Sequence, residues 1–405
     1  MDNKSLRGKR KKQRQMKQMT IACAVVIIVI AAGVYTTKFT QSLDGERGQI
    51  KQVSKNLKAD EVQELSLVMV GDNLLHMPLI RNAERSKNEY NFDSLYEKMN
   101  PYFQSADIAV IVQETVLGGN DLKYSGYPLF NSPQEVGDSM VKAGFDVILH
   151  ATNHVLDKGE KGIQNSIDFW KKYPDVKVLG INETNDVYNT IPYIEKNGIK
   201  LAVLNYTDST NGMPLPSGKE YMVNVLDKEK MIKDLTEAEK NADFTAVFMH
   251  WGTEYSLSAN EGQTELAKIM CENGADLIMG SHPHVIEPVE WISSENGNKA
   301  LVFYSLGNYV SRQKEATTLL GLMGGVKICK SKAQGAYIDS ASVMPTVTHY
   351  NTSSRGFYVY PLKDYTDELA SVHGVAKYDG KVSVERFRKT FESVFKDNTD
   401  VSLIY

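Results

Sequence analysis

Cysteine is scarce in this sequence: Cys23, Cys271 and Cys329 are the three among 405 residues. Two cysteines in the long segment after residue 37 cannot form the disulfide framework of a small secreted protein, and we expect both to be buried as small apolar side chains. Cys23 does not resemble a lipid-attachment site, because almost no apolar segment precedes it.

Internal repeats and low-complexity tracts are also lacking, which argues against a repeat architecture and against a largely disordered chain. The composition, 42% hydrophobic and 24% charged, is ordinary for a folded globular protein. The length is sufficient for one large domain or two ordinary ones.

Acidic residues are nearly missing from residues 1–18, where Asp2 is the only one. The eight basic residues there are Lys4, Arg7, Lys9, Arg10, Lys11, Lys12, Arg14 and Lys17. This tail therefore carries +7, and since the whole chain carries −4, the remainder carries −11. A basic tail can bind nucleic acid. The apolar segment that follows explains it better as a topology signal, so we expect no nucleic-acid partner.

Long apolar runs are absent except at residues 19–34 (MTIACAVVIIVIAAGV), which contain no charge. Extended to residue 37, the run reaches the length of a membrane-spanning helix, roughly 17–25 residues. Lys and Arg stay on the cytoplasmic side, so we expect a single-pass protein in the cell membrane with its main domain outside. Residues 31–33 are a weak match to a cleavage site, which favours an uncleaved signal-anchor over a cleaved signal peptide.

The rest of the chain divides into a polar juxtamembrane linker (38–64), a main domain (65–312) and an extension that completes it (313–405). Within the main domain, short apolar runs alternate with amphipathic segments, which indicates an α/β fold. The predicted strands are 65–71, 107–113, 145–151, 176–180, a hairpin over 191–205, 244–250, 276–280, 286–292 and 299–306. The predicted helices are 133–144, 161–172, 228–240 and 264–274, with a further helix at 384–395.

Histidines follow several of these strands, and the segment 280–284 (GSHPH) is the most informative. In an extended chain, side chains two positions apart project to the same side, so His282 and His284 could face one metal ion. Pro283 keeps the pair out of a helix. We therefore predict that both histidines are metal ligands rather than core residues.

Other polar residues lie at the ends of strands, where ligand groups of α/β sheets gather. Each has an ordinary explanation when taken alone, such as a helix cap for Asp72 or a turn for Asn153. Together they offer oxygens and imidazoles without thiolates, a set that suits one or two ions of Mn, Fe or Zn. The predicted ligands are Asp72, Glu114, Asn153, His154, His250, His282 and His284.

Catalytic and substrate-binding roles are predicted for neighbouring positions. A pair of ions roughly 3.5–4 Å apart could activate water for hydrolysis. His154, His250 or Glu254 could carry a proton in such a reaction. Tyr255 is predicted to contact the substrate, as is Asn308, which could otherwise orient a site group or form the turn.

These motifs resemble the capsule-synthesis protein CapA family of poly-γ-glutamate capsule formation, over roughly 250 residues between Leu65 and Arg312. The matching pieces are Gly71-Asp72, Glu114, residues 151–154 with Leu156, Asp157 and Gly159, residues 250–252 with Glu254 and Tyr255, residues 280–285, and residues 305–309. The resemblance implies a metallophosphatase-like (calcineurin-like) fold, a four-layer α/β/β/α sandwich.

The resemblance also implies a role in making, exporting or anchoring poly-γ-glutamate at the cell surface, alongside capsule synthase or export proteins of the membrane. The chain departs from the family pattern at two places. Thr152 stands where an asparagine is usual, and Asn131 and Ser132 stand where an arginine is usual before the proline. His76 lies outside the pattern and is at most an extra ligand.

Two hypotheses about function follow. The chain could be a metal-dependent hydrolase of a phosphoester or of an amide or γ-glutamyl bond, as the ligand set suggests. It could instead be a non-catalytic subunit of a capsule synthase or exporter, with a structural or vestigial metal site. A domain with net charge near −11 should not attract a polyanion from a distance unless it has a local basic groove.

Overall fold

The computed structural model describes residues 62–405. The predicted basic tail and membrane anchor, and all but the end of the predicted linker, lie outside the described residues. Among residues 62–405, no helix is both long enough and apolar enough to cross a membrane.

The first sheet has nine strands, of which the central ones are β1 (Gln63–Asn73) and β4 (Ile108–Gln113), in parallel. β5 (Val147–Leu149) and β6 (Lys177–Leu179) continue the sheet in parallel on one side. On the other side the C-terminal extension adds three antiparallel strands, β14 (Leu320–Ser331), β15 (Gly335–His349) and β16 (Tyr358–Pro361). Two short strands, β13 (Asn308–Val310) and β17 (Ser402–Leu403), pair in parallel with β1 and β15.

The second sheet has six strands in the order β11-β12-β10-β9-β8-β7. Their bounds are β7 (Tyr193–Lys196), β8 (Ile199–Thr207), β9 (Phe244–His250), β10 (Leu277–Ser281), β11 (Val289–Ser293) and β12 (Lys299–Phe303). β7 and β8 form the predicted hairpin, and its turn residues Asn197 and Gly198 both have positive φ, as a type I′ turn requires.

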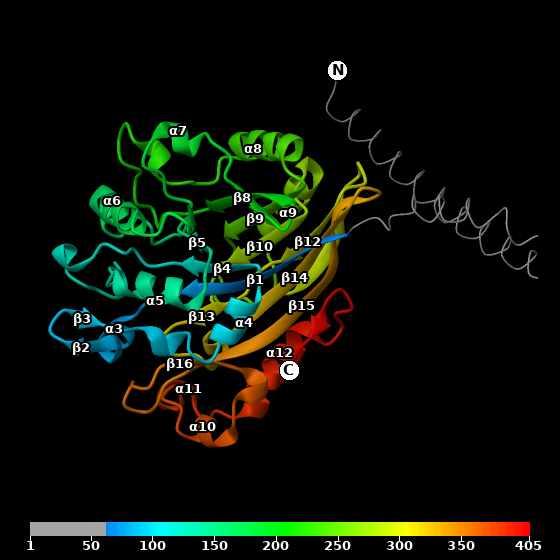
Figure 1. Cartoon of the computed structure of the whole chain (residues 1–405). Helices are drawn as coiled ribbons and strands as arrows, with labels where there is room; N and C mark the ends of the chain where they lie inside the picture. The colour runs from blue at the N-terminus through cyan, green and yellow to red at the C-terminus, as the bar shows by residue number, and fades with distance from the viewer. Residues whose placement is uncertain (1–61) are drawn as a thin grey trace, which may run out of the picture.

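The two sheets pack face to face, and helices cover their outer faces (Figure 1). The main core joins inward residues of both sheets, such as Val110 and Leu277. A second cluster packs α8 (Lys228–Asn241) and α9 (Glu261–Asn273) on the outer face of the second sheet. α4 (Asn100–Ser105) and α5 (Glu135–Ala143) cover the first sheet. The predicted mixed α/β fold is confirmed, with the layers in the order helix, sheet, sheet, helix.

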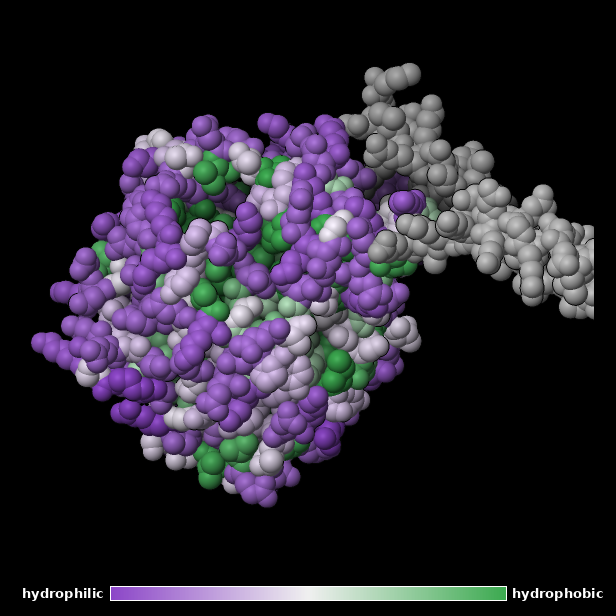
Figure 2. Space-filling model, viewed as in Figure 1, coloured by the Kyte–Doolittle hydropathy of each residue, from purple (hydrophilic) through white to green (hydrophobic). Residues whose placement is uncertain are grey.

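The remaining elements lie at the periphery. Their bounds are α3 (Met77–Ala83), β2 (Glu84–Ser86), β3 (Glu89–Tyr90), α6 (Gly159–Trp170), α7 (Asn185–Tyr188), α10 (Asp367–Ser371), α11 (Ala376–Asp379) and α12 (Val384–Phe395). On the face shown in Figure 2 the surface is mostly hydrophilic, and hydrophobic residues show only in small scattered groups. This face therefore offers polar recognition rather than a broad apolar contact.

β1 is longer than predicted, because it continues through Asp72 to Asn73. At this end it pairs with β4 on one side and with β13 on the other, with a register irregularity next to Asp72. A side chain at Gly71 would meet the backbone oxygen of Gly307 at 1.8 Å, so glycine is what allows the two strands to approach. The backbone of Asp72 is thereby held within strand β1, between β4 and β13.

Candidate metal centre

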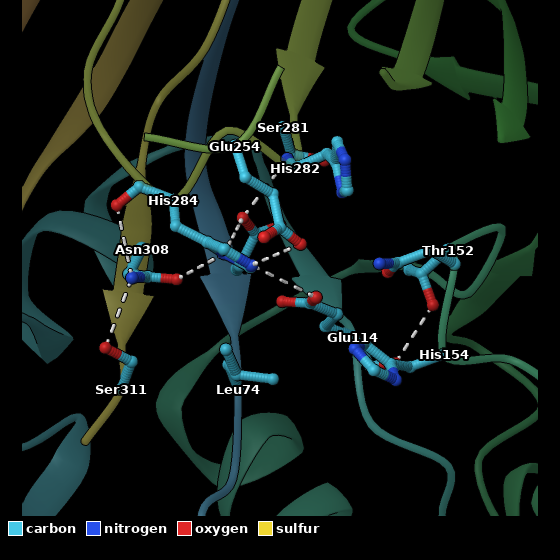
Figure 3. Close-up of polar contacts among 12 residues, drawn as sticks. Leu74, Glu114, Thr152, His154, Glu254, Ser281, His282, His284, Asn308 and Ser311 are labelled. Carbon is cyan, nitrogen blue, oxygen red and sulfur yellow. Dashed lines mark hydrogen bonds and ion pairs between the residues drawn. The ribbon is translucent and has the colours of Figure 1, made fainter. Parts of the chain in front are cut away.

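Three side chains from the two sheets converge where β1, β4 and β10 end. The ligand atoms of Asp72, Glu114 and His284 all lie within 4.8 Å of one another, and all three residues are buried. Figure 3 shows Glu114 and His284 pointing toward each other. Asp72 and Glu114 are neighbours because β1 and β4 are adjacent and parallel, and His284 comes from the loop after β10 of the other sheet. Within residues 62–405, this is the one such group of potential ligands.

The loop that carries the paired histidines is not extended as predicted. His282 and His284 have φ values of 99° and 61°, so both adopt the left-handed region that non-glycine residues rarely occupy. In this conformation the backbone N–H of His282 donates to Asp72 Oδ2 at 3.2 Å. Strain of this kind persists where the surroundings hold it, and it concentrates at functional sites.

Several buried polar atoms of the centre have no hydrogen-bond partner among residues 62–405: Asp72 Oδ1, both carboxylate oxygens of Glu114, and His282 Nδ1. An unpaired buried polar group costs about 1–3 kcal/mol, and more when it is charged. A divalent cation would supply the missing partner to these oxygens and nitrogen at once. The residues present therefore fit a Mn, Fe or Zn ion, both by their donor types and because their buried donor atoms lack hydrogen-bond partners.

The pKa values of Glu114 and His284 are both raised in the centre, for different reasons. Burial raises the pKa of Glu114 well above its usual value, and the charge of Asp72 adds to the rise while His284 opposes it. Burial alone lowers the pKa of His284, but the charges of Glu114, Asp72 and Glu254 outweigh it and raise that pKa to about 9. Without a metal, protons on these groups offset the negative charge of the carboxylates, which is the task a bound cation would perform.

His250 and Asn153 lie directly beside the three converging residues. His250 Nε2 is 3.0 Å from Asn153 Oδ1, and its Nδ1 is 2.9 Å from Ser281 Oγ and 3.7 Å from Asp72 Oδ1. Its ring centroid is 4.9 Å from that of His282. Burial and the charge of His282 depress the pKa of His250 well below its usual value, which favours the neutral ring that a metal ligand requires. The structure therefore brings three more of the predicted ligands to the same place.

His154 approaches from the far side of the centre and is held by a carboxylate. Its Nδ1 is 2.8 Å from Asp157 Oδ2, which also accepts a hydrogen bond from the backbone N–H of Phe130 at 2.7 Å. The ring packs edge-on against Phe130. Asp157 thus orients His154, a role that the sequence interpretation did not assign. The signal for it was the spacing of three residues between the histidine and the aspartate.

The remaining predicted residues divide between the surface and the interior. Glu254 and Tyr255 are about half exposed; Glu254 Oε1 is 4.0 Å from His284 Nε2, and the ring of Tyr255 is centred 6.0 Å from that of His284. Asn308 is buried, and its Oδ1 lies 3.1 Å from His284 Nδ1. His76 is outside the converging group and contacts the backbone of Leu74 and Arg312 instead.

Both ends of the Asn308 side-chain amide form hydrogen bonds, one of them to the ring of His284. Its Nδ2 has two hydrogens to donate and lies within hydrogen-bond distance of four acceptors, the backbone oxygens of His284 and Thr318 and the side chains of Ser311 and Gln313. With Oδ1 accepting from Nδ1–H of His284, the other ring nitrogen is left free to bind a metal. The structure therefore gives Asn308 an orienting part beneath the ligand.

Replacing Asn308 with Ala is expected to weaken metal binding roughly 10- to 100-fold, the usual effect of losing the partner that orients a histidine ligand. Metal titration by calorimetry measures this. Asn182→Ala is the matched control, because Asn182 is also buried and bonded to Tyr221 and Asn224 but lies away from the centre. Equal affinities in the two variants would contradict the orienting role.

Comparison with known proteins identifies relatives over the same part of the chain. Residues 66–313 match a family model described as "Bacterial capsule synthesis protein PGA_cap". The "PGA biosynthesis protein CapA" of Bacillus subtilis (strain 168) is 30% identical over 311 residues, 75% of each chain. The "Capsule biosynthesis protein CapA" of Bacillus anthracis is 26% identical over 313 residues, 75% of this chain and 71% of that one.

Among solved structures, the NAD nucleotidase of Haemophilus influenzae overlaps with a TM-score of 0.44 at 14% identity, covering 85% of this chain and 57% of that one. An overlap of this degree carries no conclusion about the chain.

Proposed function

The chain belongs to the bacterial capsule synthesis protein family, and on that premise we propose that it acts in making, exporting or anchoring a poly-γ-glutamate capsule. In this proposal residues 19–37 anchor it in the cell membrane, and the described domain stands on the outer face. The centre at Asp72, Glu114 and His284 holds a divalent metal and hydrolyses an amide or γ-glutamyl bond, or a phosphoester. The domain's metallophosphatase-like character is part of the same proposal.

One observation carries the hydrolytic part: buried carboxylate oxygens of Asp72 and Glu114 that lack partners among residues 62–405 converge with His284. Such an arrangement is costly unless a cation completes it. A divalent ion bound there would polarise the scissile carbonyl or phosphoryl oxygen and make water a stronger nucleophile at neutral pH.

The protein's own groups would then divide the remaining work. Asn308 holds His284 so that its Nε2 faces Glu114, with 3.8 Å between Nε2 and Glu114 Oε1. Glu254 lies 4.0 Å from His284 Nε2 with its side chain 43% exposed, and in this proposal it passes a proton to the leaving group. Tyr255 is half exposed beside His284, where a substrate can contact it. In this proposal His284 binds the metal and Asn308 orients His284, while Glu254 and Tyr255 contact the substrate.

Hydrolysis by the purified full chain tests this proposal. We expect cleavage of a γ-linked glutamate oligomer or of a generic phosphoester, lost on chelation and restored by Mn²⁺ or Zn²⁺. His284→Ala should lower the rate at least ~100-fold. His150→Gln is the control, because His150 is buried against Trp170 and does not join the centre. Equal rates in the wild type and His284→Ala would contradict a catalytic metal centre.

Deletion of residues 1–37 separates the enzyme from the accessory subunit. An anchored enzyme should leave the membrane fraction on deletion and keep its hydrolysis in vitro, while the cells lose capsule. Fractionation and the hydrolysis assay measure the two effects. If the full chain hydrolyses none of these substrates but deletion still abolishes the capsule, the non-catalytic reading replaces the enzymatic one.

A further inference from the structure

We propose that Arg312, together with the hydroxyl of Tyr350, forms an anion subsite beside the metal centre that binds a free carboxylate of an acidic γ-linked glutamate chain. This inference rests on the proposed function, because it specifies the substrate of that centre. It concerns residues that the sequence motifs left without a role.

Arg312 is a buried cation without an anionic partner. Its side chain is 9% exposed, yet no carboxylate in the described part of the chain lies within 4.0 Å of its guanidinium nitrogens. Nε and Nη2 donate to the neutral hydroxyls of Ser354 and Tyr378. Asp379, on the same helix as Tyr378, instead accepts hydrogen bonds from Arg386 and from the backbone N–H of Ala316. Buried arginines are otherwise nearly always paired, so an anion from outside the chain is the natural partner.

A second, independent observation places an unused hydroxyl at the same point. Tyr350 is fully buried, and its Oη has no hydrogen-bond partner among residues 62–405. The Arg312 guanidinium carbon lies 4.3 Å from the centre of the Tyr350 ring and 5.0 Å from that of Tyr378. The guanidinium therefore lies against both rings, with the Tyr350 hydroxyl close enough to interact with it. Arg312 Nη1 is not one of the nitrogens that donate to Ser354 and Tyr378, so it can join Tyr350 Oη in donating to a carboxylate.

The surroundings of the subsite are positive. A hydrogen bond from Arg312, together with the charges of Arg312, Lys377 and Lys314, lowers the pKa of the exposed Tyr378 below its usual value. Lys314 Nζ lies 5.6 Å from the centre of the Tyr378 ring. A domain of negative net charge thus has a local cationic site, which is what an acidic polymer needs in order to approach.

The loop of Arg312 borders the metal centre. The backbone N–H of Arg312 donates to His76 Nδ1 at 3.3 Å. The next residue, Gln313, accepts from Asn308 at 2.7 Å and donates to the hydroxyl of Tyr255 at 3.3 Å. Gln313 therefore lies next to the centre, and Arg312 is its neighbour in the chain. A chain with a carboxylate on every unit can place one at Arg312 while a neighbouring bond lies at the metal.

Binding of a γ-linked glutamate oligomer to the full chain, measured by calorimetry, tests the subsite. Arg312→Gln should weaken binding roughly 10- to 100-fold and Tyr350→Phe by about tenfold, since hydrogen bonds to a charged group are lost. Arg312→Lys should fall between the wild type and Arg312→Gln, because it keeps the charge but not the fork of donors. Lys268→Gln, an exposed change on α9, should bind like the wild type.

Two further probes, an amidated oligomer and inorganic phosphate, test whether the subsite recognises a carboxylate. An oligomer with its carboxylates converted to amides should bind weakly and equally to the wild type and Arg312→Gln. Inorganic phosphate should compete poorly; strong competition would make this a phosphate site and overturn the proposal. So would unchanged oligomer binding in an Arg312→Gln variant that melts like the wild type, or no oligomer binding by the wild type. Arg312-dependent binding without hydrolysis would instead reject the catalytic function and keep the subsite.

Discussion

The Glu114→Gln variant is expected to bind Mn²⁺ or Zn²⁺ at least ~100-fold more weakly than the wild-type chain, because losing even a residue behind a ligand costs up to that much. Both carboxylate oxygens of Glu114 are buried and form no hydrogen bond within the described chain. Glutamine keeps the volume but replaces one oxygen by an NH₂ group and removes the charge. Calorimetric titration of metal-free protein measures the difference.

A buried carboxylate elsewhere serves as the control for this prediction. Asp234 on α8 is bonded to Lys230 at 2.7 Å and to the hydroxyl of Tyr206 at 2.8 Å, away from the centre. Asp234→Asn should lower stability and leave metal affinity unchanged. If Glu114→Gln bound metal as tightly as the wild type, the group formed by Asp72, Glu114 and His284 would not be a metal centre.

Gly280→Ala is expected to destabilise the fold by about 3 kcal/mol or more, at the upper end of what an added methyl group does in a packed interior. The new Cβ would lie 1.8 Å from the backbone oxygen of Tyr304 and 2.3 Å from Trp251 Nε1, and neither atom can move freely. β10 would have to shift, and with it the loop carrying His282 and His284. Thermal melting should show the loss of stability, and metal titration a loss of affinity.

Gly262→Ala on α9 is the matched substitution. Its Cβ would meet no atom closer than Asn260 Oδ1 at 3.3 Å, and alanine favours a helix over glycine. Its stability should stay close to that of the wild type. A Gly280→Ala variant as stable as Gly262→Ala would show that the β10 backbone is not held by this close contact.

Much of the fold was predictable where local signals were strong. The strand at 244–250 and the helix at 384–395 have the predicted bounds. The strand is a run of apolar residues buried on both faces, and the helix begins at Ser383, which caps the N–H of Arg386. The hairpin is marked by Asn197-Gly198, a pair that type I′ turns strongly prefer.

The place of the candidate site was also predictable, because parallel strands bring their carboxyl ends to one edge of a sheet. The conformation and contacts of the residues within the site were not predictable. The left-handed backbone at His282 and His284 goes together with a hydrogen bond from His282 to Asp72, 210 residues earlier in the chain. The sequence left three alternatives for Asn308, a substrate contact, an orienting role or a turn, and its contact with His284 supports the orienting role. Contacts between distant segments carry no local signal.

Arg312 illustrates the same limit. In the sequence it is an unremarkable basic residue after a strand. Only the folded chain places it against the rings of Tyr350 and Tyr378, with no carboxylate of residues 62–405 within 4.0 Å of its guanidinium nitrogens.

Anomalous diffraction from crystals of the protein grown with Mn²⁺ tests the central claim most directly. We expect a strong anomalous peak in contact with Asp72, Glu114 and His284, and its disappearance in crystals of Glu114→Gln. An absence of any peak at these three side chains at saturating Mn²⁺, or a peak that persists in the variant at full strength, would contradict the metal centre.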